Sequence, residues 1–468
     1  MTRMLAIAIF MMNCVAVCSG AVKLPGLFAD HMVLQRESQV RVWGWAEPGE
    51  AVSVTGSWDV STSVRCKTKP NGTWETELKT AKAGGPYTLT VAGTNRTMLN
   101  DVMLGEVWVC SGQSNMAWTL ADLWTQEALE DIVEADHKEI RFFTVPQKLA
   151  AKPVKDCDGS WQVCSMTAAA EFSAVAYYYG LELHRLFGVP IGLIASHRGG
   201  TRAESWTDQK TLTAFPTFAE PLEKLSQSPD TLSDKMPSVL FNGMIAPLTK
   251  YSIRGVIWYQ GESNTDRPMQ YRSLFPAMIK AWRSHWGQGD FPFYYVQIAP
   301  YQYDAPIQSA ALREAQLMTL SVPHTGMAVT LDLGEKNNIH PSNKKDISRR
   351  LIMWAVKDIY GEGRTVCQGP RLEAMRFEEN QAVLRFYRTY GTLVAKGGEL
   401  RGFTIAGKDH VFHPAKAVIK GETVILSNPK VQLPVAARYG WSNWTDANLF
   451  NQARLPASSF RTDNWPID

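Results

Sequence analysis

The pattern of apolar and polar positions divides the chain into three parts, and the first part is rich in short strands. Residues 40–45 and 87–91 are runs of β-branched and aromatic residues that alternate in the manner of half-buried strands. Turn-forming stretches such as residues 70–72 (PNG) and 84–86 (GGP) separate such runs. This spacing predicts a small β-sandwich over residues 21–100.

Beyond residue 100, short apolar runs alternate with helical stretches. Residues 107–110, 191–195, 255–259 and 293–298 have the composition of buried strands, and residues 172–187 and 271–286 have helical periodicity. The first helical stretch closes at residues 188–190 (GVP), which is typical of a helix end. The alternation predicts an α/β domain over residues 101–365, with a parallel sheet and helices on both faces.

The last part returns to strand patterns, at residues 372–377, 382–387, 402–405 and 422–426. We therefore expect a C-terminal β region over residues 366–468. The two β regions form either two separate modules or one module that the α/β domain splits. The sequence leaves both arrangements open.

Residues 1–20 have the pattern of a signal peptide. Arg3 gives a positive start, residues 4–17 are an apolar run, and residues 19–21 (SGA) are small enough for cleavage. The run is short for a membrane anchor of about 20 residues, and no basic cluster follows it. Lipidation at Cys18 is disfavoured because Val17 stands where a small residue is usual. We expect an exported protein, periplasmic or secreted, without a membrane span.

Charge and cysteine content exclude several classes of partner and site. The formal net charge of +3 gives no reason to expect a nucleic-acid or membrane-surface partner. Five of the seven cysteines lie beyond residue 20, and an odd number excludes a complete disulfide framework. Their scattered spacing argues against a zinc site, and we expect no metal or cofactor. Cys157 and Cys164 flank a turn-like stretch, and both pairing and two free thiols remain open.

Four segments that follow predicted strands of the α/β domain are rich in reactive and turn-forming residues. They are residues 111–116 (SGQSNM), 196–201 (SHRGGT), 260–264 (QGESN) and 337–341 (NNIHP). Active sites of open parallel sheets form at the carboxyl ends of the strands. The four segments would bring a serine, glycine amides, side-chain amides and a histidine to one crevice, which suits acyl transfer.

The strings GQSNM, GGTRAESW, WYQGESN and IHPSNK, in this order, resemble the sialate O-acetylesterase branch of the SGNH/GDSL hydrolases. The resemblance covers residues 100–360 and extends to LFADHMVLQR and NLFNQARLPASSFRT near the two ends. It implies a three-layer α/β/α SGNH-hydrolase domain and an exported esterase whose substrate is an O-acetylated sugar, sialic acid first. An acetylated polysaccharide such as xylan is the alternative substrate, and a non-catalytic glycan-binding protein is the alternative class.

The resemblance makes Ser114 the nucleophile and His340 its base. A serine hydroxyl needs a base within hydrogen-bond reach, and a strand-to-helix turn would expose it beside amides that favour negative charge. His340 would take the proton of Ser114 and return it to the leaving sugar hydroxyl. By themselves, Ser114 also fits a helix N-cap and His340 a loop histidine fixed by Pro341.

The oxyanion of the tetrahedral intermediate requires preorganised donors. The family pattern implies the backbone amides of Ser114 and of Gly199 or Gly200, because glycine permits close approach of the backbone. The wider superfamily adds an asparagine two residues after a glycine, but the string GESN moves it one step further, to Asn264. The third donor is therefore Asn264 or Gln260, unless each satisfies only its own loop.

Three further residues are predicted substrate contacts. Gln113 precedes the nucleophile, and His197 lies beside the glycine pair. Arg313 falls in the family-like string LREAQ and could pair bidentately with a sugar carboxylate. The plain alternative for Arg313 is a surface helix arginine.

One departure from the superfamily concerns the acid that usually precedes the histidine by two or three residues. Those positions hold Asn337 and Asn338, whose amides carry no charge. Three explanations are open: a Ser–His dyad with a backbone carbonyl that orients His340, a carboxylate from elsewhere such as Asp332 or Glu262, or a weakened enzyme. We favour the dyad, and we expect Asn338→Asp to be tolerated because it restores a charge near the imidazole.

Overall fold

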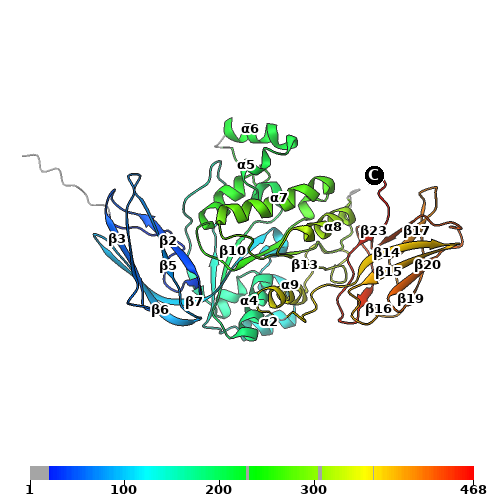
Figure 1. The fold of residues 1–468 in the computed structure, drawn as a ribbon, viewed down its shortest axis with the longest axis horizontal. Coiled ribbons are helices and arrows are strands. Elements are labelled where there is room, and N and C mark those ends of the chain that lie inside the picture. Colours follow the sequence, from blue (N-terminus) through cyan, green and yellow to red (C-terminus); the bar gives the residue numbers. More distant parts are fainter. Residues whose placement is uncertain (1–20, 228–230, 304–307, 362, 468) are drawn as a thin grey trace, which may run out of the picture.

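The computed structural model describes residues 21–227, 231–303, 308–361 and 363–467. Figure 1 shows three parts in a row, with a β-rich N-terminal part in blue, a central α/β part and a β-rich C-terminal part in orange and red. The two β-rich parts lie at opposite ends of the molecule and share no sheet among the described residues. They are therefore two modules. Residues 1–20, the predicted signal peptide, lie outside the described residues.

The N-terminal part consists of mostly antiparallel strands, with β1 parallel to β7, and it continues directly into the central sheet. Its strands are β1 (Val33–Gln35), β2 (Gln39–Trp45), β3 (Ala51–Gly56), β4 (Ser63–Lys67), β5 (Thr73–Lys79), β6 (Gly84–Ala92) and β7 (Arg96–Gly112). The first half of β7 pairs with β6, and its second half pairs with two strands of the central sheet. The expected domain boundary at residue 100 thus falls inside one continuous strand.

The central part has a sheet of order β13-β12-β11-β7-β10-β8-β9. The first six of these strands run parallel and β9 is antiparallel. Their bounds are β8 (Ile140–Thr144), β9 (Trp161–Val163), β10 (Ile191–His197), β11 (Gly255–Tyr259), β12 (Phe293–Val296) and β13 (Thr325–Ala328). Because connected parallel strands need crossover helices, the alternation in the sequence correctly indicated this sheet.

Helices cover both faces of the sheet, as Figure 1 shows, with α7 and α8 on one side and α4 and α9 on the other. Their bounds are α1 (Ser114–Ala117), α2 (Gln126–Val133), α3 (Met166–Ala170), α4 (Ala174–Phe187), α5 (Gln209–Leu212), α6 (Ala219–Gln227), α7 (Pro268–Trp286), α8 (Ser309–Met318) and α9 (Lys344–Asp358). Successive residues of β7 face opposite layers: Trp108 packs with the α4 and α9 side chains, and Val109 with those of α7. The predicted three-layer α/β/α fold is confirmed.

The C-terminal part is a β-structure with a hydrophobic core of its own. One sheet has the order β14-β15-β20-β19, a second has the order β18-β17-β21-β23, and β16 pairs with β22. The strands are β14 (Arg371–Glu378), β15 (Gln381–Tyr387), β16 (Leu393–Ala395), β17 (Phe403–Ala406), β18 (Phe412–Pro414), β19 (Lys416–Lys420), β20 (Thr423–Ser427), β21 (Ala436–Tyr439), β22 (Leu449–Asn451) and β23 (Phe460–Arg461). Side chains of both sheets, including Leu384 and Phe403, share this core.

The cysteines of the described residues are all free thiols. Cys157 and Cys164 are both buried, and burial raises the pKa of Cys157 to about 12 and that of Cys164 to about 11. The pairing alternative for these two residues is therefore wrong.

Within the described ranges, no helix has the length and apolarity to cross a membrane, and no group of acidic, histidine and cysteine side chains could hold a metal ion.

Candidate active site

The predicted site segments meet at the carboxyl edge of the central sheet. β7 ends at Gly112, β10 at His197 and β11 at Tyr259. In the sheet register, Gly112 lies opposite His197 on one side and Tyr259 on the other. Ser114 begins α1 two residues after β7 ends. The structure therefore brings the serine turn, the glycine turn and the 260–264 loop side by side, as the sequence predicted.

The sharp turn before Ser114 depends on Gly112. Its φ is +142°, and a Cβ atom there would lie 2.1 Å from the carbonyl oxygen of Tyr259, so only glycine fits. The Gln113 amide donates to that same oxygen at 2.9 Å. Gln113 occupies the N-cap position of α1 and Ser114 is its first helical residue. The N-cap alternative for Ser114 is therefore wrong.

The side chain of Gln113 holds the neighbouring loop. It is 3% exposed, and its Oε1 accepts hydrogen bonds from the backbone amides of Gly261 at 3.4 Å and Ser263 at 3.3 Å. The side-chain oxygen of Gln113, the predicted substrate contact, is therefore already bonded to protein amides. Its role in this structure is to join the serine turn to the 260–264 loop.

The glycine turn packs directly against the predicted nucleophile. A Cβ atom on Gly199 would lie 3.4 Å from the Cβ atom of Ser114. Gly199 and Gly200 are both exposed, and Gly200 has a φ of +70°. The Arg198 amide donates to the Gly112 carbonyl at 3.1 Å and fixes the start of this turn. Exposed glycine amides beside Ser114 are what an oxyanion site requires.

The two candidate third donors are buried and bonded to each other. Gln260 Nε2 donates to the Thr201 carbonyl at 3.2 Å and to Asn264 Oδ1 at 2.7 Å, which uses both of its N–H groups. Asn264 Nδ2 donates to Glu204 Oε2 at 3.0 Å, and its Oδ1 also accepts from the Ala203 amide. Asn264 keeps one N–H group and Gln260 keeps none, so of the two side chains only Asn264 can still donate to substrate.

His340 is held by its backbone and by an aromatic stack. Asn338 Oδ1 accepts from the His340 amide at 3.0 Å, and Asn338 Nδ2 donates to the His340 carbonyl at 2.8 Å. The imidazole stacks on Trp118, with ring centroids 4.6 Å apart and planes 22° apart. Within the described part of the chain the imidazole makes no hydrogen bond, to Ser114 or to a backbone carbonyl. The expected carbonyl partner is therefore absent there, and Trp118 orients the ring.

Neither of the alternative carboxylates contacts His340. Asp332 forms a bidentate ion pair with Arg350, at 2.6 and 2.8 Å. Glu262 Oε1 accepts from Asn115 Nδ2 at 2.6 Å. Both acids thus have other partners in the folded chain, and neither forms a hydrogen bond or ion pair with His340 in the described part of the chain.

A buried polar network lies behind the two reactive residues. Lys344 Nζ donates to Asn115 Oδ1 at 2.6 Å, and Asn115 Nδ2 donates to Glu262 and to the Ile339 carbonyl at 3.0 Å. Lys344 Nζ also lies 5.3 Å from the ring centroid of Tyr259. Asn115 and Ile339 are the neighbours of the nucleophile and the base in sequence. The network therefore fixes the serine turn against the histidine loop.

Electrostatics favour a neutral imidazole at neutral pH. Burial and the nearby Lys344 charge lower the pKa of His340. Burial lowers the pKa of Lys344 to about 7 and raises that of Glu262. A base has to be unprotonated to take the serine proton, so the shift of His340 suits its predicted role.

His197 lies where the sequence placed it, at the end of β10 beside the glycine turn. Its Nδ1 is buried and has no hydrogen-bond partner among the described residues. Burial lowers the pKa of His197 to about 4, so the ring is neutral at physiological pH. An unpartnered polar atom next to the reactive pair is compatible with the predicted contact to substrate.

Arg313 lies inside the molecule, so the surface alternative is wrong. The residue is 0% exposed, and its guanidinium donates to the hydroxyls of Ser459 and Ser309 and to the carbonyls of Gly440 and Ser442, at 2.6 to 3.3 Å. It fastens α8 to the C-terminal part. No exposed portion of this guanidinium is left for a sugar carboxylate.

Three important residues escaped the sequence reasoning: Trp118, Asn115 and Lys344. Asn115 and Lys344 belong to the strings GQSNM and IHPSNK, so their positions beside Ser114 and His340 were the available signal. Trp118 lies four residues after Ser114, one helical turn away, and its stacking on a distant loop has no local signature.

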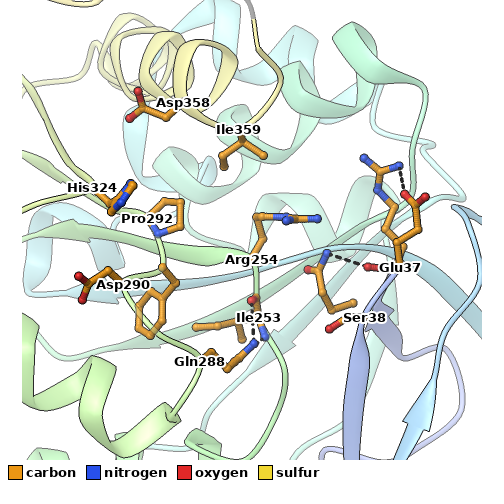
Figure 2. Close-up of a pocket in the computed structure, with 13 residues that line it drawn as sticks. Glu37, Ser38, Ile253, Arg254, Gln288, Asp290, Pro292, His324, Asp358 and Ile359 are labelled. Atoms are coloured by element: carbon orange, nitrogen blue, oxygen red, sulfur yellow. Dashed lines mark hydrogen bonds and ion pairs between the residues drawn. The ribbon is translucent and has the colours of Figure 1, made fainter.

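A cavity of about 460 Å³ lies at the opposite edge of the same sheet, and Figure 2 shows residues that line it. Arg254, Pro292 and His324, which line it, directly precede the strands β11, β12 and β13. Ser114 and His340 lie where the strands end. This cavity is therefore separate from the candidate active site.

Comparisons with known proteins agree with this geometry. Residues 104–350, more than half of the chain, match the family described as carbohydrate esterase, sialic acid-specific acetylesterase. The sialate O-acetylesterase of Mus musculus is 30% identical over 89% of this chain and 88% of its own length. That of Rattus norvegicus is 32% identical over 73% of this chain and 74% of its own. The crystal structure of a novel carbohydrate acetylesterase from Xanthomonas citri is similar with a TM-score of 0.87 and 38% identity, over 95% of this chain and 100% of that one.

Proposed function

Because the chain belongs to the sialic acid-specific acetylesterase family of carbohydrate esterases, we propose that it deacetylates sugar hydroxyls through an acetyl-enzyme formed on Ser114. A carbohydrate O-acetylesterase is the activity that the family and its relatives share. The observation that carries the mechanism is the position of Ser114, between the exposed glycine turn and the loop of His340.

In the first half of the reaction, Ser114 Oγ attacks the acetyl carbonyl carbon while His340 takes its proton. The carbonyl oxygen becomes an oxyanion, which the backbone amides of Ser114 and the Gly199–Gly200 turn stabilise. The ester C–O bond then breaks, and the sugar oxygen leaves with the proton from His340. In the second half, water gives its proton to His340 and attacks the acetylated serine, which releases acetate and restores Ser114.

The structure brings the loop of His340 next to the turn of Ser114 without a hydrogen bond between the two side chains in the described part of the chain. Catalytic hydrogen bonds of empty sites are often long and tighten when substrate binds. The Trp118 stack and the Asn338 clamp hold the imidazole close to α1, the helix that begins at Ser114.

The mechanism is tested by trapping the acetyl-enzyme. Intact-mass spectrometry of protein mixed rapidly with a chromogenic acetyl ester should detect a species one acetyl group heavier, and peptide mapping should place the group on Ser114. His340→Ala should abolish the modification, whereas the matched loop variant His324→Ala should not. Release of acetate with no acetylated serine at any time point would contradict the mechanism, and no ester hydrolysis at all would favour a glycan-binding protein.

A neutral, polymeric carbohydrate is the substrate class that the site supports best. A sialic acid would need a cation for its carboxylate, yet Arg313 is enclosed by the C-terminal part. The arginines that flank the glycine turn, Arg198 and Arg202, already pair with Asp234 and Asp266 at 2.9 and 3.1 Å. Each of these cations is therefore partly neutralised by an aspartate, which weakens its attraction for a sugar carboxylate.

Sialic acid is the second candidate, because the curated relatives are named for it. A single panel separates the two substrate classes. Acetate release should be measured from O-acetylated sialic acids and from acetylated xylan fragments at equal ester concentration. A higher kcat/KM on the sialic acids would refute the neutral substrate.

Export is part of the same proposal. The N-terminal pattern of Arg3, an apolar run and small residues supports cleavage near residue 20. Mass spectrometry of the protein from its native host should find an N-terminus close to Gly20, Ala21 or Val22. An intact Met1 in the cytosolic fraction would overturn export and leave the esterase activity untouched.

A further inference from the structure

Trp124 is a large apolar side chain that the fold holds in solvent. It lies between η1 (Ala121–Leu123) and α2, and it is 88% exposed. Its backbone has φ 51° and ψ 32°, the left-handed region. An aromatic residue rarely adopts this conformation, which strains the chain. Because the indole is exposed, no burial of its apolar surface offsets that strain.

The residues on both sides enforce this conformation. Leu123 is 6% exposed and packs into the core that contains α4. Thr125 caps α2, because its Oγ1 accepts from the Ala128 amide at 3.1 Å. Thr119 and Asp122 close the preceding turn with reciprocal bonds of 2.9 and 3.2 Å. The surroundings thus determine where the indole stands, which is the usual condition of a strained residue that serves a ligand.

The segment that carries Trp124 adjoins the segment that follows His340. Leu123 and Thr125 line a cavity of about 170 Å³ together with Ser342 and Asn343, which begin two residues after His340. Lys345, on the same segment, pairs with Glu127 and Asp131 of α2. Trp118, six residues before Trp124, stacks on His340 itself. A glycan chain with one acetylated sugar at Ser114 would therefore extend toward this side of the site.

The chemistry around Trp124 fits an uncharged sugar ring. An indole face packs well on the C–H face of a pyranose, whose hydroxyls remain free for polar neighbours. The polar neighbours here are acidic and exposed, with Asp122, Glu127 and Glu130 on the same turn and helix. Their oxygens accept hydrogen bonds from hydroxyls. Glu127 pairs with Lys345, whereas Asp122 and Glu130 have no cation partner among the described residues and repel a carboxylate.

We propose that Trp124 is a stacking platform for a neutral sugar next to the acetylated one, a subsite outside the reactive pair. This inference rests on the proposed function, since it supplies the binding of the polymer that the function requires. Leu129 and Val133 are also exposed, at 55% and 69%, on the outer face of α2. A protein contact through that face is the competing outcome, and the experiment separates the two.

The test compares Trp124→Ala with the matched control Leu129→Ala, one helical turn further along. Steady-state kinetics are measured on an acetylated neutral xylo-oligosaccharide and on a monomeric chromogenic acetate. Trp124→Ala should raise KM for the oligosaccharide about tenfold with kcat unchanged, the factor expected for loss of one stacking contact. The small ester should be hydrolysed at the wild-type rate. Leu129→Ala should match the wild type on both substrates.

Two further variants separate stacking from structure. Trp124→Phe keeps an aromatic face and should recover part of the lost affinity. Trp124→Gly should melt at a temperature no lower than the wild type, since glycine adopts φ 51° without strain, and should still lose oligosaccharide affinity. Equal losses on both substrates, or an unchanged oligosaccharide KM, would overturn the platform.

Other outcomes are equally decisive. If light scattering finds an oligomer that both Trp124→Ala and Leu129→Ala dissociate, the surface is a protein contact and the platform is refuted. If wild-type protein deacetylates no sugar, the proposed function fails, and the platform is tested by calorimetric titration of deacetylated xylo-oligosaccharide. Weaker binding by Trp124→Ala than by wild type would uphold it there, and equal binding would refute it.

Discussion

Lys344 allows a stringent test of the buried network, because its burial should appear in the pH dependence of stability. Burial lowers its pKa from 10.5 to about 7 in the folded protein. The unfolded chain keeps the proton up to about pH 10.4, so between pH 7 and 10 the unfolded state binds more protons than the folded state. The folded state therefore carries a penalty, of about 4 kcal/mol at pH 7 and about 2 kcal/mol at pH 9.

The perturbation is Lys344→Met, which keeps an unbranched side chain, one atom shorter, and removes the charge. It abolishes the penalty and leaves Asn115 Oδ1 without its donor, a loss of about 1–3 kcal/mol. At pH 7 we expect the variant to be more stable than wild type by about 2 kcal/mol, in keeping with the replacement of buried charges by apolar groups. At pH 9 the advantage should shrink by about 2 kcal/mol.

Urea unfolding at both pH values measures this difference. The matched control is Lys345→Met, at the next position. Burial alone would lower the pKa of Lys345, but its bonds to Glu127 and Asp131 outweigh it and raise the pKa. Both states of Lys345 thus stay protonated from pH 7 to 9, and its variant should track the pH dependence of wild type. Parallel stability curves for wild type and Lys344→Met would refute the reasoning.

The remaining predictions concern the reactive residues. Ser114→Ala should remove nearly all esterase activity with an unchanged melting temperature, and activity within tenfold of wild type would exclude Ser114 as nucleophile. Asp332→Asn and Glu262→Gln should each retain more than about a hundredth of wild-type turnover while His340→Ala does not; a loss of about 10⁴ in either acid variant, with the fold intact, would reveal a true triad. Asn338→Asp should destabilise by about 1–3 kcal/mol in thermal melts and lower kcat, since it removes a donor to the His340 carbonyl; a variant as stable and active as wild type would contradict this.

The last of these expectations reverses the one drawn from the sequence. A charge near the imidazole appeared useful as long as Asn338 was free to face the ring. In the structure its Nδ2 also donates to Glu335 Oε2, at 3.0 Å. An aspartate would place two carboxylates side by side and would lose both donated hydrogen bonds. The sequence shows which residues are neighbours but not which of their atoms are already used.

The local pattern of apolar and polar residues predicted most of the fold. β11 coincides with the predicted run 255–259, and α4 ends at Phe187 and is followed by Gly188 in the left-handed conformation, as the GVP signal indicated. β7 was harder to delimit, because a strand that passes from one sheet to the next has no break in its apolar pattern. The site was predictable where a motif occurs at a strand end, as for Ser114 and the glycine turn. It was not predictable where long-range packing decides, as for Arg313, three of whose four partners lie more than a hundred residues away.

The missing carboxylate can now be understood from what occupies its place. A triad carboxylate orients the imidazole and stabilises its positive charge, and its loss lowers turnover by about 10⁴ in the serine-protease case. Here Asn338 fixes the backbone of His340, and Trp118 fixes the plane of the ring. An aromatic face also attracts a cation, by about 0.5–2 kcal/mol, which is well below the roughly 5.5 kcal/mol that a factor of 10⁴ represents. Trp118 can thus replace the orientation that an acid supplies but only part of its charge stabilisation. Burial and the nearby Lys344, which lower the pKa of His340, act in the opposite direction and make the neutral base the resting form.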